Sequence, residues 1–195
     1  SWKWRVRLVD MHTANTEPEW LKNFRQKSFE AFKKLPLEES RLFAKYADYP
    51  EMVFENFVPD FSKSPIPEEF YKENGPVFVQ NGADAFVSDL PKELKNKGVI
   101  FTDMIPAVKE HKDKLVNYFT HDWKNKFEAF NAAFFVNGVF IYAPENVEIE
   151  TPFRKINLDN GKNASSKSII LGADNSKFTI IEESYSVNGK YFSAY

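Results

Sequence analysis

The stretch "NAAFFVNGVFIYAPENVEIETPF", Asn131 to Phe153, decides the fold because the hydrophobic pattern changes within it. Its first residues form an apolar cluster suited to the end of a helix, and its last residues alternate between apolar and polar. Gly138 lies between the two patterns and permits a backbone turn there. We interpret the stretch as the place where a helical region passes into the first strands, with its junction filled by Phe134, Phe135, Phe140 and Tyr142.

After Gly138 the sequence predicts strands and no helix. Short apolar or alternating runs occur at residues 139–142, 147–151, 168–171 and 178–181. They are separated by turn signals at Pro144, Asn160-Gly161, Gly172 and Asn188-Gly189. This spacing is typical of a β-sandwich and equally of a β-solenoid, in which each short strand pairs with the equivalent strand one coil away.

The first predicted helix begins at a capping box of Thr16 and Glu19 and is stopped by Pro36. Its core stripe consists of Leu21, Phe24, Ser28, Ala31 and Leu35. The rings of Trp20, Phe24, Phe29 and Phe32 occupy more than one face of this helix, so one face can pack on the domain while another meets a partner; for most of these rings the core is the favoured interpretation.

The rest of the N-terminal region contains shorter elements. The alternating cations of residues 2–8 suit a solvated strand face, and prolines break residues 37–70 into short helical pieces and loops. Asn81-Gly82 predicts a type I′ hairpin near residues 77–88. A strand-like start at residue 99 leads to a cap at Thr102 or Asp103 and a helix with core residues Met104, Ala107, Val108, Leu115 and Phe119. A short helix at 127–134 completes a mainly helical region, residues 1–134, before a β region at 135–195.

Composition limits the possible functions. The 195 residues are 43% hydrophobic and include 20 Phe, enough for a large core. Lys and Arg number 26 against 28 Asp and Glu, a net charge of -2, which argues against nucleic acid as a partner. No apolar run approaches a membrane span and no secretion leader opens the chain, so a cytoplasmic protein is expected. The lack of cysteine excludes disulfides and cysteine-held zinc or iron–sulfur clusters in this chain.

Two histidines are candidate metal ligands. His111 and His121, with Asp113 and Asp122 nearby, offer nitrogen and oxygen ligands suited to iron or zinc. A metal site needs three or four convergent ligands, so solvated histidines around a helix end are the favoured interpretation. His12 has a weaker claim.

Paired carboxylates are the other candidate chemistry. Glu148 and Glu150 would share one face of a strand, as an acid and base pair of a glycosidase requires, but the solvent face of a half-buried strand explains them more simply. Glu182 and Glu183 have the same interpretation. No phosphate-binding loop or nucleophile elbow is present. We therefore assign no catalytic, cofactor-binding or metal-binding residue.

Three stretches together carry a family resemblance. They are "EPEWLKNFRQKSFEAFKKLPL", "KGVIFTDMIPAVKEHKDKLVNYF" and "KFEAFNAAFFVNGVFIYAPENVEIETP", and "SKFTIIEE" adds to them. In this order they resemble the N-terminal half of the SufB/SufD family of iron–sulfur cluster assembly proteins. The resemblance implies an α+β fold, in which a helical N-terminal region is followed by the first coils of a parallel β-helix.

The resemblance also implies a function. The lack of cysteine favours the SufD-like branch, a non-catalytic scaffold subunit working with SufB-like and SufC-like (ATPase) subunits, with the iron–sulfur cluster held transiently by the complex and not by this chain. A homodimer through the β-helix surface is also compatible. The alternative is a carbohydrate-binding or carbohydrate-active β-solenoid protein.

The end of the chain suggests truncation. Apolar residues continue to "YFSAY" without a capping helix, and an open strand edge can pair with another chain. The C-terminal helices that dock the ATPase in the family have no counterpart here. We therefore expect a fragment, onto which no functional residue of the family can be carried.

Overall fold

The computed structural model describes residues 16–36, 54, 57, 60–72, 75–161, 164–186 and 193–194, the last two as backbone. The predictions for residues 2–8, His12, most of 37–59 and Asn188-Gly189 lie outside the described residues. The helices of the described part are α2 (Glu19–Lys34), η3 (Glu68–Phe70), α4 (Lys92–Asn96), α5 (Met104–Glu110), α6 (Lys112–Leu115), η4 (Val116–Tyr118) and α7 (Lys126–Phe134).

The strands of the described part form three sheets. They are β1 (Val77–Asn81), β2 (Asp84–Val87), β3 (Ile100–Asp103), β4 (Val139–Ala143), β5 (Phe153–Asp159), β6 (Ala164–Ser165), β7 (Ile169–Gly172), β8 (Ile180–Ser186) and β9 (Ser193–Ala194). The sheet orders are β2-β1-β5-β8, β3-β4-β7 and β6-β9. Because β1 pairs with β5 and β3 pairs with β4, both larger sheets join strands from the two sides of residues 134–135.

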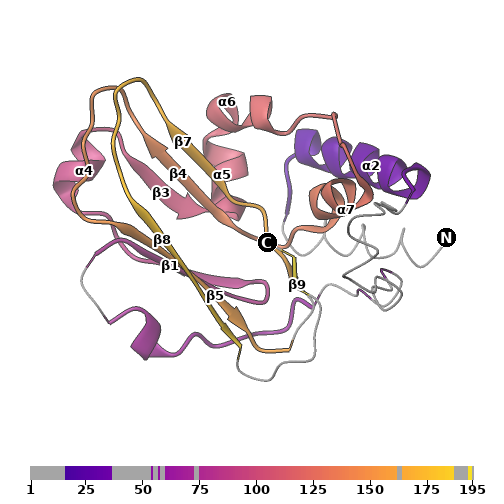
Figure 1. Ribbon diagram of the computed structural model, residues 1–195, viewed down its shortest axis with the longest axis horizontal. Coiled ribbons are helices and arrows are strands. Elements are labelled where there is room, and N and C mark those ends of the chain that lie inside the picture. The colour runs from indigo at the N-terminus through magenta and orange to yellow at the C-terminus, as the bar shows by residue number, and fades with distance from the viewer. Residues whose placement is uncertain are drawn as a thin grey trace, which may run out of the picture.

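The strands after residue 138 pair in parallel at a nearly constant separation along the chain (Figure 1). Phe140 faces Ile169, 29 positions later, and Phe153 faces Ile180, 27 positions later. The isolated bridge from Glu148 to Lys177 again covers 29 positions. Successive passes of the chain therefore lie one over the other, and the continuation of this stacking as a parallel β-helix stays a prediction.

A repeated turn accompanies the stacked strands. Asn146 and Asn175 both adopt the left-handed conformation, with φ of 58° and 56°, and they are 29 positions apart. The side-chain amide of Asn175 donates a hydrogen bond to Oδ1 of Asn146 at 3.2 Å. The sequences Pro144-Glu145-Asn146 and Ala173-Asp174-Asn175 are thus two copies of one turn, a repeat that the sequence analysis did not use.

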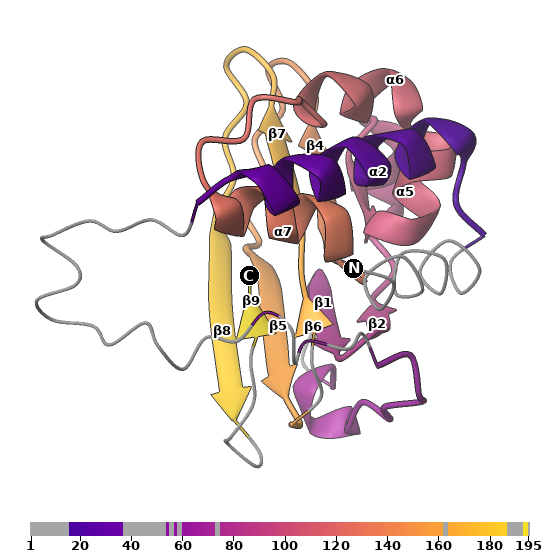
Figure 2. The same cartoon turned by 90° about the vertical axis from the view of Figure 1, so that its right-hand side faces the viewer.

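Helices α2 and α7 lie side by side against one end of the sheets (Figure 2). Phe29 and Phe32 of α2 pack with Phe130 and Phe134 of α7 in one buried cluster. Lys126, the first residue of α7, links this helix to the C-terminal end of α2. Its ammonium donates to the carbonyls of Phe32 and Leu35 at 2.8 and 2.9 Å. Carbonyls at the end of a helix lack N–H donors within the helix, so Lys126 satisfies two of them. The positive charge of this ammonium also interacts favourably with the negative, C-terminal end of the α2 dipole.

The predicted helix starts and lengths need two corrections. Thr16 forms no cap: Pro18 is the N-cap residue of α2 and no side chain caps this end, while Thr16 is left-handed at φ 49°. The segment after Asp103 is three pieces instead of one helix, because His111 takes a non-helical conformation between α5 and α6. This break lets Leu115 join the same apolar cluster as Met104.

The predicted strands need three corrections. Asn81 pairs with Asp84, so the hairpin turn is Gly82-Ala83, and a positive φ at Gly82 but not at Ala83 is the pattern of a type II′ turn. Residues 147–151 are not a strand, since Glu148 makes a single bridge there. The prediction also missed β5, the strand between β1 and β8.

The rings of the first helix lie in the core, as the sequence predicts for most of them. Phe24, Phe29 and Phe32 are all buried, and Trp20 is half-buried with its ring edge-to-face against Phe119 at 5.1 Å. These rings therefore stabilise the core. Among the described residues, no helix has the length and apolar character that crossing a bilayer requires.

The register of the stacked strands can be tested by a disulfide, because the chain has no native cysteine. Glu148 and Lys177 are exposed partners of an isolated parallel bridge between successive passes of the chain, whose spacing suits a disulfide. We expect Glu148→Cys with Lys177→Cys to form an intramolecular disulfide under mild oxidation, seen as faster migration on a non-reducing gel. The matched pair Glu148→Cys with Ser176→Cys is one residue out of register and should cross-link poorly. Equal cross-linking of both pairs would contradict the register.

Candidate functional site at the junction of helices and sheets

The junction, residues 135–138, connects α7 to β4 and is buried throughout. Phe134, Phe135 and Phe140 have no exposed surface and Tyr142 is half-buried, so the predicted filling of the junction by these rings is confirmed. Phe134 packs in the cluster between α2 and α7, whereas Phe135 and Phe140 pack in the cluster around α5. The junction therefore separates two halves of the core.

Gly138 is required because another part of the backbone lies directly over it. A Cβ atom at this position would lie 1.9 Å from the carbonyl oxygen of Lys167. The backbone N–H of Lys167 donates to the carbonyl of Asn137 at 2.9 Å, and that of Met104 donates to the carbonyl of Gly138 at 2.7 Å. Three segments distant in sequence thus meet at the junction.

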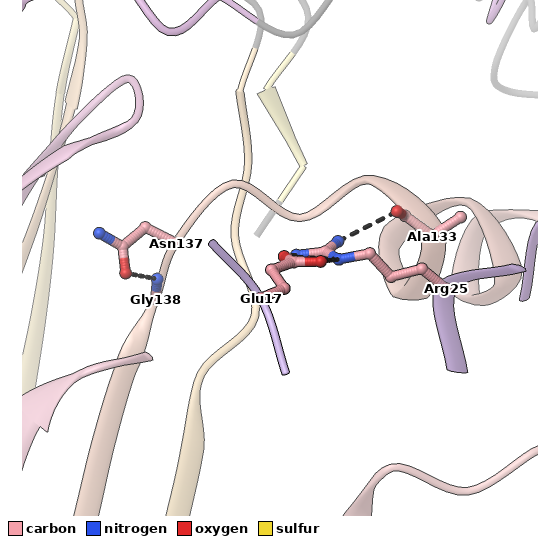
Figure 3. Close-up of polar contacts among 5 residues, drawn as sticks. All are labelled: Glu17, Arg25, Ala133, Asn137 and Gly138. Atoms are coloured by element: carbon pink, nitrogen blue, oxygen red, sulfur yellow. Dashed lines mark hydrogen bonds and ion pairs between the residues drawn. The ribbon is translucent and has the colours of Figure 1, made fainter. Parts of the chain in front are cut away.

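Arg25 is the buried cation beside the junction (Figure 3). Its Nε donates to both carboxylate oxygens of Glu17, at 2.9 and 3.0 Å, and its Nη2 donates to Oε1 at 2.6 Å. Its Nη1 donates to the carbonyl of Ala133 at 3.0 Å, one of the last carbonyls of α7 that lack a helical partner. The guanidinium carbon lies 3.8 Å from the centre of the Phe135 ring.

The electrostatics of this pair follow from its burial. Loss of solvation lowers the pKa of Arg25 below its ordinary value, and the Glu17 carboxylate opposes that shift. Bidentate, charge-assisted hydrogen bonds help to offset the desolvation of a buried ion pair. The arrangement therefore orients α2 against the end of α7, and the guanidinium is shielded from solvent.

Asn137 supplies the polar contacts on the other side of the junction (Figure 3). Its Oδ1 accepts from the backbone N–H of Gly138 at 2.9 Å, and its Nδ2 donates weakly to Ala83 O and to Oδ2 of Asp103, both at 3.4 Å. The hairpin and β3 are thus tied to the start of β4.

A second set of hydrogen bonds links the junction to the next pass of the chain. The side-chain amide of Asn131 donates to Oγ of Ser165 at 2.8 Å and to the carbonyl of Ser166 at 2.7 Å. The hydroxyl of Ser166 donates to Oε1 of Gln80 at 2.9 Å. Buried polar groups that are satisfied in this way specify one arrangement of the surrounding strands.

The histidines do not form a metal site. His111 packs on Phe140 with ring centres 5.8 Å apart, whereas His121 stacks on Phe24 at 5.6 Å. Burial lowers the pKa of His121, with a further contribution from Lys27. Within the described residues, no group of three or more His, Cys, Asp or Glu side chains could hold a metal ion, so Asp113 and Asp122 do not complete a site with them.

Three of the four candidate carboxylates form ion pairs between successive passes of the chain. Glu148 pairs with Lys177 at 2.7 Å, and the two strand-forming residues Glu182 and Glu183 pair with Lys155 and Arg154, at 2.7 and 2.9 Å. Glu150 is exposed and outside any strand. These contacts do not give the two facing carboxylates of a glycosidase.

Three buried polar residues were not predicted from the sequence: Arg25, Lys155 and Asn157. For Arg25 a signal existed: it lies four positions after Leu21 and three before Ser28, on the apolar stripe of α2. A cation inside such a stripe indicates a buried partner. Lys155 and Asn157 carried no such signal, because their shared partner Glu182 comes more than twenty positions later.

Removing Arg25 should expose the cost of breaking a buried ion pair. We expect Arg25→Met to lower the free energy of unfolding by about 3–5 kcal/mol, because Glu17 stays buried and loses the guanidinium that balances its charge. The double variant Glu17→Met with Arg25→Met should lose less than Arg25→Met alone, and exposed Lys27→Met should change stability by less than about 0.5 kcal/mol. Urea unfolding checks this, and additive losses in the double variant would contradict it.

Asp103 should make stability depend on pH. Burial raises the pKa of its carboxyl above the ordinary 3.8, and the hydrogen bond from Asn137 opposes that shift only in part. The unfolded chain therefore ionises first, so stability falls as pH rises from the unfolded pKa through the folded pKa. Asp103→Asn should be more stable than the parent at neutral pH, with the gain diminishing at acid pH. Urea unfolding at several pH values checks this, and a gain independent of pH would contradict it.

Comparison with known proteins identifies the family. Residues 9–154 match the family described as SufBD protein N-terminal region. The iron–sulfur cluster assembly protein SufD of Bacillus subtilis (strain 168) is 32% identical over 192 residues, covering 90% of this chain and 44% of that protein. A SufBD family protein of Staphylococcus saprophyticus is 31% identical over 167 residues, covering 74% of this chain and 36% of that protein.

A SufBD family protein of Staphylococcus aureus (strain USA300) is 30% identical over 174 residues, covering 77% of this chain and 37% of that protein. The chain thus spans less than half the length of these relatives. The resemblance noted in the sequence is confirmed, and the chain belongs to the SufB/SufD family of iron–sulfur cluster assembly proteins, of which it represents the N-terminal portion.

Proposed function

We propose that this chain is the N-terminal part of a SufD-like, non-catalytic scaffold subunit of an iron–sulfur cluster assembly complex. The observation that carries the proposal is the stacking of parallel strands at separations of 29 and 27 positions, in a chain that matches the SufBD N-terminal region. Such stacking builds a stiff surface by repetition, which is what a scaffold needs.

The architecture we propose is a helical base carrying the first coils of a parallel β-helix. Strands β4 and β5 belong to the first coil and β7 and β8 to the second. The stacked asparagines of the repeated turn and the Glu148–Lys177 pair support this assignment, because both join positions 29 apart at the same corner.

The proposed non-catalytic role is supported by the kinds of side chain in this chain and by the contacts that they make. The chain has no cysteine to hold a cluster or carry sulfur. In the described residues, Glu148, Glu182 and Glu183 are paired with cations, and the two histidines lie against aromatic rings. We therefore propose that SufB-like and SufC-like subunits supply the cluster chemistry and the ATPase, and that this subunit supplies shape.

The test is assembly of the complex. A tagged full-length gene product, co-expressed with the SufB-like and SufC-like subunits of its own organism, should recover both in one complex by affinity purification and gel filtration. Recovery of neither subunit would contradict the proposal.

A locked variant sharpens this test. The full-length protein with Glu148→Cys and Lys177→Cys, oxidised before mixing, should recover the partners as well as the parent does, because the disulfide fixes the register that the complex is proposed to use. Reduced protein is the matched control. Loss of the partners on oxidation alone would contradict the proposal that the stacked strands act as a rigid unit.

A further inference from the structure

A cavity of about 380 Å³ lies between α2, the link from η4 to α7, and the residue Lys167. This volume falls in the range of small-ligand sites. Rings contribute much of the wall and a few polar groups complete it; the lining residues used below are Phe24, Asp122, Trp123, Phe127, Glu128 and Lys167.

The aromatic wall is formed before any ligand binds. Phe24 is buried and packs against Phe119 at 5.1 Å between ring centres and against Trp123 at 6.2 Å. His121 stacks on Phe24 from outside the cavity, at 5.6 Å, and lies 5.4 Å from Trp123. Rings held by several neighbours lose little freedom when a ligand binds, which favours affinity.

Lys167 presents a cation to this wall. Its backbone is fixed, because its N–H donates to Asn137 O and its carbonyl oxygen covers Gly138. Its ammonium lies 5.5 Å from the centre of the Phe119 ring and, in the described part of the chain, has no hydrogen-bond acceptor and forms no ion pair. Burial lowers the pKa of Lys167; the charge of Glu128 opposes that shift, and the charge of Arg25 adds to it.

The two carboxylates that line the cavity, Asp122 and Glu128, belong to exposed residues. Glu128 accepts from the backbone N–H of Lys124 at 2.8 Å and from Nδ2 of Asn125 at 3.3 Å, which caps α7. Its charge attracts Lys167 but does not reach it as an ion pair. Asp122 is exposed and therefore hydrated. Among the described residues that line the cavity, Lys167 is the cationic group and has no ion pair, and an anion would supply one.

We propose that this cavity binds a carboxylate carried on an apolar, ring-sized body, with the ammonium of Lys167 as the counter-ion and Phe24, Trp123 and Phe127 around the apolar part. The carboxylate can belong to a free small molecule or to a side chain of a partner segment. The proposal that the cavity binds a carboxylate is independent of the proposed scaffold function.

The test uses three fluorinated probes of the same shape and different charge. These are 3-(4-fluorophenyl)propionate, its primary amide and 2-(4-fluorophenyl)ethylamine, titrated with the full-length protein and observed by fluorine NMR line broadening. We expect the acid to bind at least about tenfold more tightly than the amide, because the amide loses the charge-assisted hydrogen bond. Equal binding of acid and amide, tighter binding of the amine to Asp122 and Glu128, or no binding of the acid would overturn the proposal.

Matched variants locate the site. Lys167→Met keeps the length of the side chain and should weaken the acid about tenfold while leaving the amide unchanged. Lys124→Met, an exposed cation on the neighbouring link, should leave both unchanged. An acid affinity that is unaltered by Lys167→Met would refute the assignment. The comparison of acid with amide on the parent protein stays decisive if Lys167→Met does not fold.

A competition experiment then identifies the source of the carboxylate. If the acid probe at saturating concentration releases a SufB-like or SufC-like subunit from the assembled complex, the natural carboxylate belongs to that partner. If the complex stays intact and the probe still binds it, the natural ligand is a free molecule. If the complex does not assemble at all, the scaffold function is contradicted. The binding of the probe to the isolated protein still tests the cavity.

Discussion

The bidentate ion pair between Arg25 and Glu17 is the interaction that places the helices relative to the sheets. A guanidinium without exposed surface must find all its partners inside the protein, and here they come from the segment before α2 and from the end of α7. The end of α7 is followed at once by the junction, so fixing Ala133 also fixes where β4 begins. This buried contact therefore helps to fix where the stacked strands begin.

Buried polar contacts also link β5 to the neighbouring strand β8. Lys155 and Asn157 of β5 are buried, and both donate to Oε1 of Glu182 on the neighbouring strand, at 2.7 and 3.2 Å. Ser166 and Gln80 make a comparable contact nearer the junction. A slip of one residue would turn these polar groups toward apolar neighbours and leave them unpaired, so they fix the register more strictly than apolar packing would.

Local patterns in the sequence predicted the elements that are held by apolar packing, because any apolar neighbour can bury such a side chain. The aromatic filling of the junction, the strand at β4 and the buried positions from Met104 to Phe119 follow from periodicity and from the need to bury rings. Strand β5 was missed because Arg154, Lys155 and Asn157 interrupt its apolar pattern, and the carboxylates that pair with them are contributed by β8. Arg25 is a different case: its position on the apolar stripe of α2 was a signal of burial, and its ion-pair partner Glu17 lies in the segment just before the helix.

The separation in sequence between paired residues of successive passes falls from 29 to 27 positions between Glu148 and Phe153. Glu148 and Lys177 are bridge partners, yet a few residues later Phe153 already faces Ile180, so the first pass of the chain carries two extra residues at 149–152. They are accommodated where Thr151 lies against Gly75, outside any ladder, and the strands on both sides keep their pairing. This corner absorbs differences in chain length. It is the place where an insertion can arise during evolution, or a peptide can be grafted by design, without shifting the stacked strands that flank it.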